Sequence, residues 1–445
     1  MPTQTAAKRD AYLKQLLTNG AGQFAAGLEL TELRTAAQAL VREQTFPSTR
    51  DEEWRFTDLS SLLETDFQVP KAMTPAVSAL DLAQLSLAED LAKSRLVFVN
   101  GAFVAGLSSV AGLPTSVTLT NLSSLYTESH SIESQWQAQV MSKLAQVPGN
   151  HEVFTALNTA SFWDTAVVWV PHNVKVNQPI HLVHITLPGS MPTLAYPRCL
   201  VVAESNSSVI LVEEFRSLGE GSGFTNSVTE IWLGDGARVN HTRLQQEQLQ
   251  AVHIGKTAIS QARDSRYTCN AIALGSRLCR HNLDIFQAGP QTETYLYGLS
   301  AIAHQQHSDL HSAINLNHPY GAADQLHKCI VDNKAHAVFN GKVFVPRAAQ
   351  LTNASQLNRN LLLSNKARVD TKPQLEIIAD NVKCAHGATV SQLQADEIFY
   401  LQSRGISAAE AQRLLLYGFA MEIVEKIPVT PIRDGLTAQV SAWAS

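Results

Sequence analysis

Hydrophobic and polar positions change their spacing twice along this chain. Between Lys8 and Glu43, apolar residues recur every three or four positions, which predicts helices that end before Pro47. From Thr165 to about Ser391, short runs rich in β-branched residues are separated by Gly, Asn, Asp and Pro, which predicts strands. No amphipathic helical pattern interrupts these runs. The sequence therefore predicts helices first and then a long region of short strands.

Two shorter patterns refine this prediction. Asn100-Gly101 lies between two apolar runs in the segment 96–104, which indicates a β-hairpin with a type I′ turn. At the C-terminal end, a helix is expected from about Ala395 to Ser403, with Gly405 ending it. A second helix should begin after a capping box formed by Ser407 and Glu410, run to about Lys426 and end before Pro428.

The long strand region is compatible with a sandwich, a barrel or a β-solenoid. Single sandwiches and barrels usually end at about 200 to 250 residues, whereas a solenoid lengthens by adding coils, so the length favours a solenoid. A strict solenoid should show an internal repeat, and no clean repeat is visible. Residue patterns alone leave these alternatives open.

Composition narrows the class of protein. A chain of 445 residues exceeds the usual limit for one core, so two or three folding units are expected. The formal net charge of −5 argues against nucleic-acid binding. We also expect no signal peptide and no membrane span, because no long uninterrupted apolar stretch occurs. Five cysteines without a C-x-x-C pair indicate a reducing compartment, so a cytoplasmic location is expected.

Cys384 and His386 are the strongest candidates for chemistry. Residues two apart on a strand point to the same side, so a thiolate and an imidazole would be presented together. This pair suits iron, copper or zinc, but most zinc and iron–sulfur sites take four protein ligands. Further ligands would have to come from elsewhere in the fold or from a partner chain. The alternative is a buried thiol beside a hydrogen-bonded histidine.

Other candidate sites are weaker. His304, His307 and His311 form the densest group of histidines, but their spacing fits no zinc motif, and hydrogen bonding within stacked coils or at a subunit interface explains them better. Gly255-Lys256-Thr257 lacks the upstream glycine of a nucleotide-binding loop, and no nucleophile elbow is present. Two competing functions remain at this stage: a β-helix polysaccharide lyase or hydrolase, and a purely structural scaffold.

Longer segments carry a resemblance to a known family. DEEWRFTDL at 51–59, HQQHSDLH at 304–311, KCIVDNKAHAVFNG at 328–341, VDTKPQLEI at 369–377 and KCAHGAT at 383–389 resemble the SufB/SufD family in order and spacing. The SufB branch typically carries an additional N-terminal cysteine cluster, and this chain has no cysteine before Cys199. The resemblance is therefore closer to the SufD branch.

This resemblance implies a fold and a function. It implies a mainly β protein, with a right-handed parallel β-helix core at 156–392 between helical domains at 1–155, which includes the hairpin, and 393–445. It also implies a non-catalytic scaffold subunit of the SUF iron–sulfur cluster assembly machinery, paired with a SufB-like subunit. A transient iron–sulfur cluster would form at their interface, where His386 matches a contributing histidine and Cys384 lies beside it.

The resemblance implies further partners. A SufC-like ATPase would dock on the C-terminal helical domain. The second helix of that domain is apolar on nearly all sides, which is explained either by burial in a helical hairpin or by a partner surface. The docking residues expected on it are Leu414, Leu415, Tyr417, Phe419 and Met421. Whether a flavin binds in the complex, and whether the isolated chain forms a homodimer, is not decided by the sequence.

Overall fold

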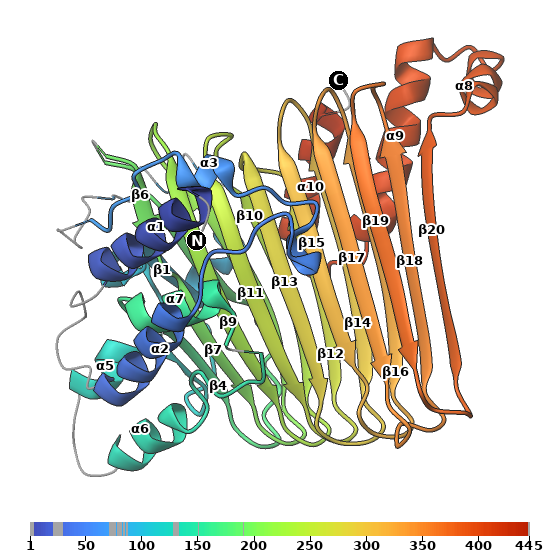
Figure 1. Ribbon diagram of the computed structural model, residues 1–445. Helices are drawn as coiled ribbons and strands as arrows, with labels where there is room; N and C mark the ends of the chain where they lie inside the picture. Colours follow the sequence, from blue (N-terminus) through green and yellow to red (C-terminus); the bar gives the residue numbers. More distant parts are fainter. Residues whose placement is uncertain are drawn as a thin grey trace.

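A parallel β-solenoid forms the body of the protein, with helices at its N-terminal and C-terminal parts (Figure 1). The computed structural model describes residues 4–20, 30–70, 77, 82, 85, 88–127, 133–149, 151–189 and 191–443. From β8 onward, consecutive strands alternate between two sheets, so each coil of the solenoid contributes one strand to each sheet. The predicted parallel β-structure is confirmed, and the solenoid is the alternative that holds.

Each sheet follows a single path of neighbouring strands. The first sheet, here called sheet B, has the order β2 (Ala102–Phe103), β1 (Arg95–Val99), β5 (Ile180–Thr186), β8 (Ser208–Ser217), β10 (Arg238–Gln246), β12 (Arg266–Ala273), β14 (Glu293–Ile302), β16 (Ala322–Val331), β18 (Asn353–Leu362) and β20 (Lys383–Gln392). The second sheet, sheet A, has the order β19 (Arg368–Ile377), β17 (His336–Val345), β15 (His307–Asn315), β13 (Leu278–Gln287), β11 (Val252–Gln261), β9 (Gly223–Leu233), β7 (Arg198–Ala203), β4 (Ala166–Val170) and β3 (Thr118–Asn121), and β6 (Thr193–Ala195) also pairs with β9.

The coils repeat in backbone geometry without repeating in sequence. At one corner of successive coils, a residue adopts a positive φ and donates its N–H to a carbonyl of the next coil. Asn206 donates to Asp235 at 2.8 Å, and Leu351 donates to Asn381 at 2.7 Å. The other residues of this column are Asn173, Gly236, Asp264, Gln291 and Tyr320. Because residues of different types occupy equivalent corners, the coils leave no clean sequence repeat.

Apolar side chains fill most of the space between the two sheets. Successive residues of a strand alternate between the interior and the outer surface of its sheet, so residues two apart share a side. On sheet A, Ile231, Ile259, Ile285, Ile314 and Val343 occupy equivalent positions in successive coils and form a buried stack. This stack belongs to one hydrophobic cluster that runs along the solenoid interior.

The predicted hairpin is present and extends the solenoid. Asn100 and Gly101 connect β1 to β2 with φ angles of 51° and 85°, as a type I′ turn requires. β1 also pairs in parallel with β5, so this N-terminal segment adds two strands to sheet B. β3 adds an antiparallel strand to sheet A through β4.

N-terminal helices cover the outer surface of sheet A at the end where the solenoid begins (Figure 1). Residues 21–29 of the predicted helical stretch lie outside the described residues. After α2, residues 46–59 cross the outer surface of sheet A, and we call them the strap. Its Trp54 lies 3.8 Å from the guanidinium of Arg280 on β13, and its Glu52 accepts from Lys372 on β19 at 2.6 Å. The helices are α1 (Gln4–Gly20), α2 (Thr31–Glu43), α3 (Ser60–Leu63), α5 (Leu122–Thr127), α6 (Glu133–Met141) and α7 (Val153–Ser161).

Two C-terminal helices, α9 (Ala408–Val424) and α10 (Thr430–Trp443), cover the outer surface of sheet B. The third, α8 (Ala395–Gln402), packs beside α9. The predicted boundaries hold: Gly405 has a φ of 85° after α8, and the hydroxyl of Ser407 accepts from the N–H of Glu410 at the start of α9. Leu416, Ala420 and Ile423 of α9 pack with strand residues such as Leu299 and Ile330.

Candidate functional site

The last coil of the solenoid leaves two strand edges open. Among the residues that the structure describes, no strand pairs with the outer edge of β19 or of β20. The N–H of Lys383 on β20 donates to the carbonyl of Thr352 at 2.9 Å, so the backbone of Lys383 faces the paired edge. Backbone directions alternate along a strand, so every second residue from Cys384 onward directs its N–H and C=O groups to the open edge. These edge-facing residues are Cys384, His386, Ala388, Val390 and Gln392. On β19, Pro373 occupies an edge-facing position and has no N–H to donate.

Cys384 and His386 lie on the same side of β20, as the strand pattern predicts, and this side faces the solenoid interior. Cys384 pairs with Ala354 of β18 and packs against the apolar interior, whereas His386 pairs with Gln356 and is exposed. Partial burial raises the pKa of the Cys384 thiol. A bound metal would favour the thiolate, because a coordinating thiol is deprotonated. The two side chains therefore form an accessible donor pair at an open edge.

Buried amides line the interior directly behind this pair. Gln356, Asn358 and Asn360 of β18 point inward and are each at most 2% exposed. Within the described part of the chain, no group of three or more His, Cys, Asp or Glu residues is arranged to hold a metal ion. Cys384 and His386 are thus surrounded by neutral polar groups and apolar side chains on their own chain.

The five residues of α9 that were expected to dock a partner differ in their exposure to solvent. Leu414 is 47% exposed and Tyr417 is 36% exposed, and Leu415 is half-buried. Met421 is buried in the cluster of the C-terminal helices and contacts Thr437 of α10, and Phe419 is half-buried under the ammonium group of Lys328. The two most exposed aromatic residues of this region, Phe399 at 70% and Tyr400 at 58%, lie on α8, which packs beside α9.

Comparisons with known proteins agree with this architecture. The family model described as SUF system FeS cluster assembly, SufBD core domain, matches residues 185–419, and the model of the SufBD protein N-terminal region matches residues 23–182. The chain belongs to the SufBD family. The resemblance seen in the sequence motifs is confirmed, and the protein is a SUF-type iron–sulfur cluster assembly protein.

Relatives of this SufBD-family chain cover most of its length. An iron-sulfur cluster assembly SufBD family protein of Synechocystis sp. is 45% identical over 420 residues, which are 93% of this chain and 90% of that protein. The chloroplastic protein ABCI7 of Arabidopsis thaliana is 35% identical over 92% of this chain and 84% of its own length. The iron-sulfur cluster assembly protein SufD of Escherichia coli is 30% identical over 89% of this chain and 88% of its own length.

The histidine group of this SufBD-family protein makes hydrogen bonds between elements. His307 and His311 lie on the outer surface of sheet A under the strap. His307 Nε2 is 2.9 Å from the hydroxyl of Thr57, and His311 Nδ1 is 2.6 Å from the carboxylate of Asp309. Burial lowers the pKa of His307 to about 4, so this ring is neutral at pH 7. These contacts agree with hydrogen bonding as the explanation for His307 and His311, whereas His304 lies at a turn, where its backbone N–H donates to the side chain of Asn333.

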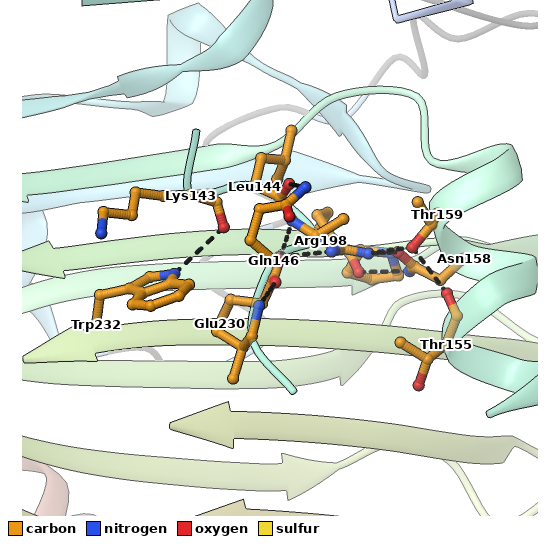
Figure 2. A network of polar contacts seen from close by, with 12 residues as sticks. Lys143, Leu144, Gln146, Thr155, Asn158, Thr159, Arg198, Glu230 and Trp232 are labelled. Atoms are coloured by element: carbon orange, nitrogen blue, oxygen red, sulfur yellow. Dashed lines mark hydrogen bonds and ion pairs between the residues drawn. The ribbon is translucent and has the colours of Figure 1, made fainter. Parts of the chain in front are cut away.

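A buried ion pair near the start of the solenoid was not found from the sequence. Figure 2 shows Arg198 of β7 and Glu230 of β9 joined to a loop and to α7. Arg198 donates to Asn158 and Thr159, and the carboxylate of Glu230 accepts from the backbone N–H of Ala145 at 2.8 Å. This network fixes the N-terminal cover to sheet A, and its charged groups are shielded from solvent, so we assign it a structural role.

The interior also contains charged residues that the sequence did not reveal. Glu213 is fully buried between His184 and His241, whose ring nitrogens lie 3.6 and 3.3 Å from its carboxylate. Desolvation raises the pKa of Glu213, but the two neighbouring imidazole rings hold it well below its usual range. The only sequence signal was a pair of acidic residues, Glu213 and Glu214, inside the apolar run at 209–215. Of the described helices, none combines the length and apolar content that a bilayer crossing requires.

Proposed function

We propose that this chain is a scaffold subunit that supplies His386 and Cys384 to a nascent iron–sulfur cluster at an interface with a SufB-like subunit. The observation that carries this proposal is a thiol and an imidazole on the inner side of an edge strand with an open backbone. A neutral imidazole binds ferrous iron, and a thiolate also binds iron. Because this chain supplies two ligands, the partner subunit would supply the remaining ligands of the cluster.

β20 is the better edge for a partner strand. Its edge-facing positions from Cys384 to Gln392 all carry an N–H, whereas the ladder on β19 is interrupted at Pro373. Exposed apolar side chains near this end, including Val390 at 49% and Ile378 at 53%, would be covered by a second solenoid. A site completed only at such an interface can open to release its cluster. In isolation, the same edge can pair with a second copy of the chain.

The exposed surface of α8 and α9 supports a docking site for a SufC-like ATPase. Phe399, Tyr400, Leu414 and Tyr417 form the apolar part of this surface, which we call the α8–α9 patch. Of the docking residues expected from the sequence, Phe419 and Met421 are left out of this patch, because Phe419 packs against Lys328 of sheet B and Met421 is buried beside α10. The ATPase would supply the energy for opening and closing the interface. On this proposal the chain is itself non-catalytic and acts in the cytoplasm.

The test is cluster formation in the assembled complex. We would co-express the chain with its SufB-like and SufC-like partners, purify the complex and measure iron, acid-labile sulfide and visible absorbance. His386→Ala should lower the cluster content several-fold at unchanged subunit composition, because the exposed ring contributes little to folding. Thr389→Ala, which changes an exposed outward-facing position on the same strand, is the matched control. A normal cluster content in the His386→Ala complex would remove this residue from the mechanism.

A further inference from the structure

Gln356 lies directly behind His386 in the solenoid. The two residues are register partners on β18 and β20, and both side chains point to the interior. Parallel neighbouring strands are separated by about 4.8 Å, so a glutamine side chain is long enough to reach the imidazole of the next coil. Gln356 is 2% exposed, whereas His386 is at the open end. Of the residues on β18, Gln356 is the one aligned with His386.

The hydrogen bonds of Gln356 direct its amide nitrogen away from the open end. Its Nε2 donates to Oε1 of Gln325 at 2.9 Å, and Nε2 of Gln325 donates in turn to the hydroxyl of Ser312 at 2.8 Å. On the opposite wall, Gly341 leaves the space that this amide occupies, since a Cβ there would collide with Nε2. The amide is therefore held in place by its hydrogen bond to Gln325 and by its close packing against Gly341 of sheet A.

The amide oxygen of Gln356 is left without a donor. Within the described part of the chain, its Oε1 is shielded from solvent and accepts no hydrogen bond. A buried acceptor without a partner is unfavourable, so an additional donor at this point would stabilise the arrangement. The imidazole of His386 is the ring aligned with it on the open side.

We infer that Gln356 is a positioning residue for His386. When the ring turns inward, one ring N–H donates to Oε1 of Gln356, which fixes the tautomer and leaves the other nitrogen free as a ligand. Outer hydrogen bonds of this kind orient most metal-binding histidines. The role in metal binding rests on the proposed function, whereas the hydrogen bond itself is a property of the isolated chain.

The hydrogen bond can be tested without iron. In the full chain with ¹⁵N-labelled histidine, at a pH where the ring is neutral, long-range ¹H–¹⁵N spectra report the tautomer of His386, assigned with His386→Ala. The wild type should show one dominant tautomer with a slowly exchanging ring N–H. Gln356→Met and Gln356→Asn should give mixed tautomers and fast exchange, because the first lacks an acceptor and the second is too short.

The control separates positioning from general loosening of the last coils. Asn358→Leu removes another buried amide from the same strand, but Asn358 is aligned with Ala388 instead of His386. It should leave the His386 spectrum unchanged. Equal changes in the Asn358 and Gln356 variants, or no change in either, would overturn the inference. These results are independent of cluster content: if His386→Ala lowers cluster formation while the Gln356 variants keep the wild-type spectrum, the inference fails and the proposed function stands.

Discussion

Lys328 on β16 and Glu422 on α9 form an ion pair beneath the C-terminal helices. The Lys328 side chain is 1% exposed, and its ammonium group also donates to the carbonyl of Phe419 at 2.9 Å. Glu422 is 44% exposed and can return to water. Burial lowers the pKa of Lys328, whereas the hydrogen bond from Lys328 lowers the pKa of Glu422. Loss of the ion pair would therefore leave Lys328 buried without a counter-charge, whereas Glu422 would be solvated.

Removing either partner should have unequal effects. Glu422→Ala leaves a buried ammonium group without its counter-charge and should lower the free energy of unfolding by about 3 kcal/mol. Lys328→Met removes the buried charge and lets Glu422 hydrate, so it should cost only about 1 kcal/mol. Urea unfolding of both variants measures the difference. A Lys328→Met variant that is the less stable of the two would contradict this difference between the partners.

Proline substitutions can separate the open edge of β20 from its paired edge. Ala388 directs its N–H to the open edge, and the preceding Gly387 accommodates a following proline. Ala388→Pro should therefore leave a folded monomer that no longer captures the SufB-like chain in a pull-down. Thr389→Pro removes a hydrogen bond to β18 and should destabilise the monomer by about 3 kcal/mol. Partner capture by the Ala388→Pro chain at wild-type level would place the interface elsewhere.

The α8–α9 patch can be tested by charge. Leu414→Asp leaves the monomer unchanged because the side chain is exposed, but it should weaken capture of a SufC-like ATPase by about 2 kcal/mol or more once a partner buries the carboxylate. Phe399→Asp should act in the same way. Gln412→Asp, at an exposed polar position of α9, serves as the control. Undiminished binding by both patch variants in a quantitative pull-down would contradict this docking site.

Acid sensitivity should come partly from His327. Burial lowers the pKa of this histidine to about 3, so the folded protein keeps the ring neutral while the unfolded chain protonates it below about 6.5. Between pH 6.5 and 4.5 the unfolded state binds more protons, so this residue alone should reduce stability by about 2.5 kcal/mol as the pH falls. Urea midpoints at pH 7 and 4.5 should differ less in His327→Leu than in the wild type. Equal differences would show that His327 is protonated in the folded state.

Local patterns predicted much of this molecule. The two-residue period of strands placed Cys384 and His386 on one side of β20, and the Asn100-Gly101 turn and the Ser407 cap were identified because each depends on neighbouring residues. The solenoid itself was left open by the residue patterns, because its repeat lies in corner backbone angles that residues of several types can adopt.

Contacts between coils could not be predicted in the same way. Glu213 contacts His241 of the next coil, and Gln356 is aligned with His386. Both relationships depend on the register between neighbouring coils, and the coils differ in length. A run such as Glu213-Glu214 is typical of a solvent-exposed segment, yet both carboxylates are buried with histidine partners. Likewise, α9 is apolar on most sides, and its sequence does not say that Met421 packs inward while Leu414 faces solvent.

The strap has a consequence for how the chain folds during synthesis. Glu52 is translated early, but its partner Lys372 follows 320 residues later, on a strand of the final coil. Trp54 and Thr57 likewise meet Arg280 and residues of β15 that emerge long after them. During synthesis, each new coil can pack on the coil before it as it leaves the ribosome. The strap cannot make its contact with β19 until the final coil has been synthesised. Docking of the whole strap on sheet A is therefore a late event in folding. A chain truncated before β19 would lack the contact between Glu52 and Lys372.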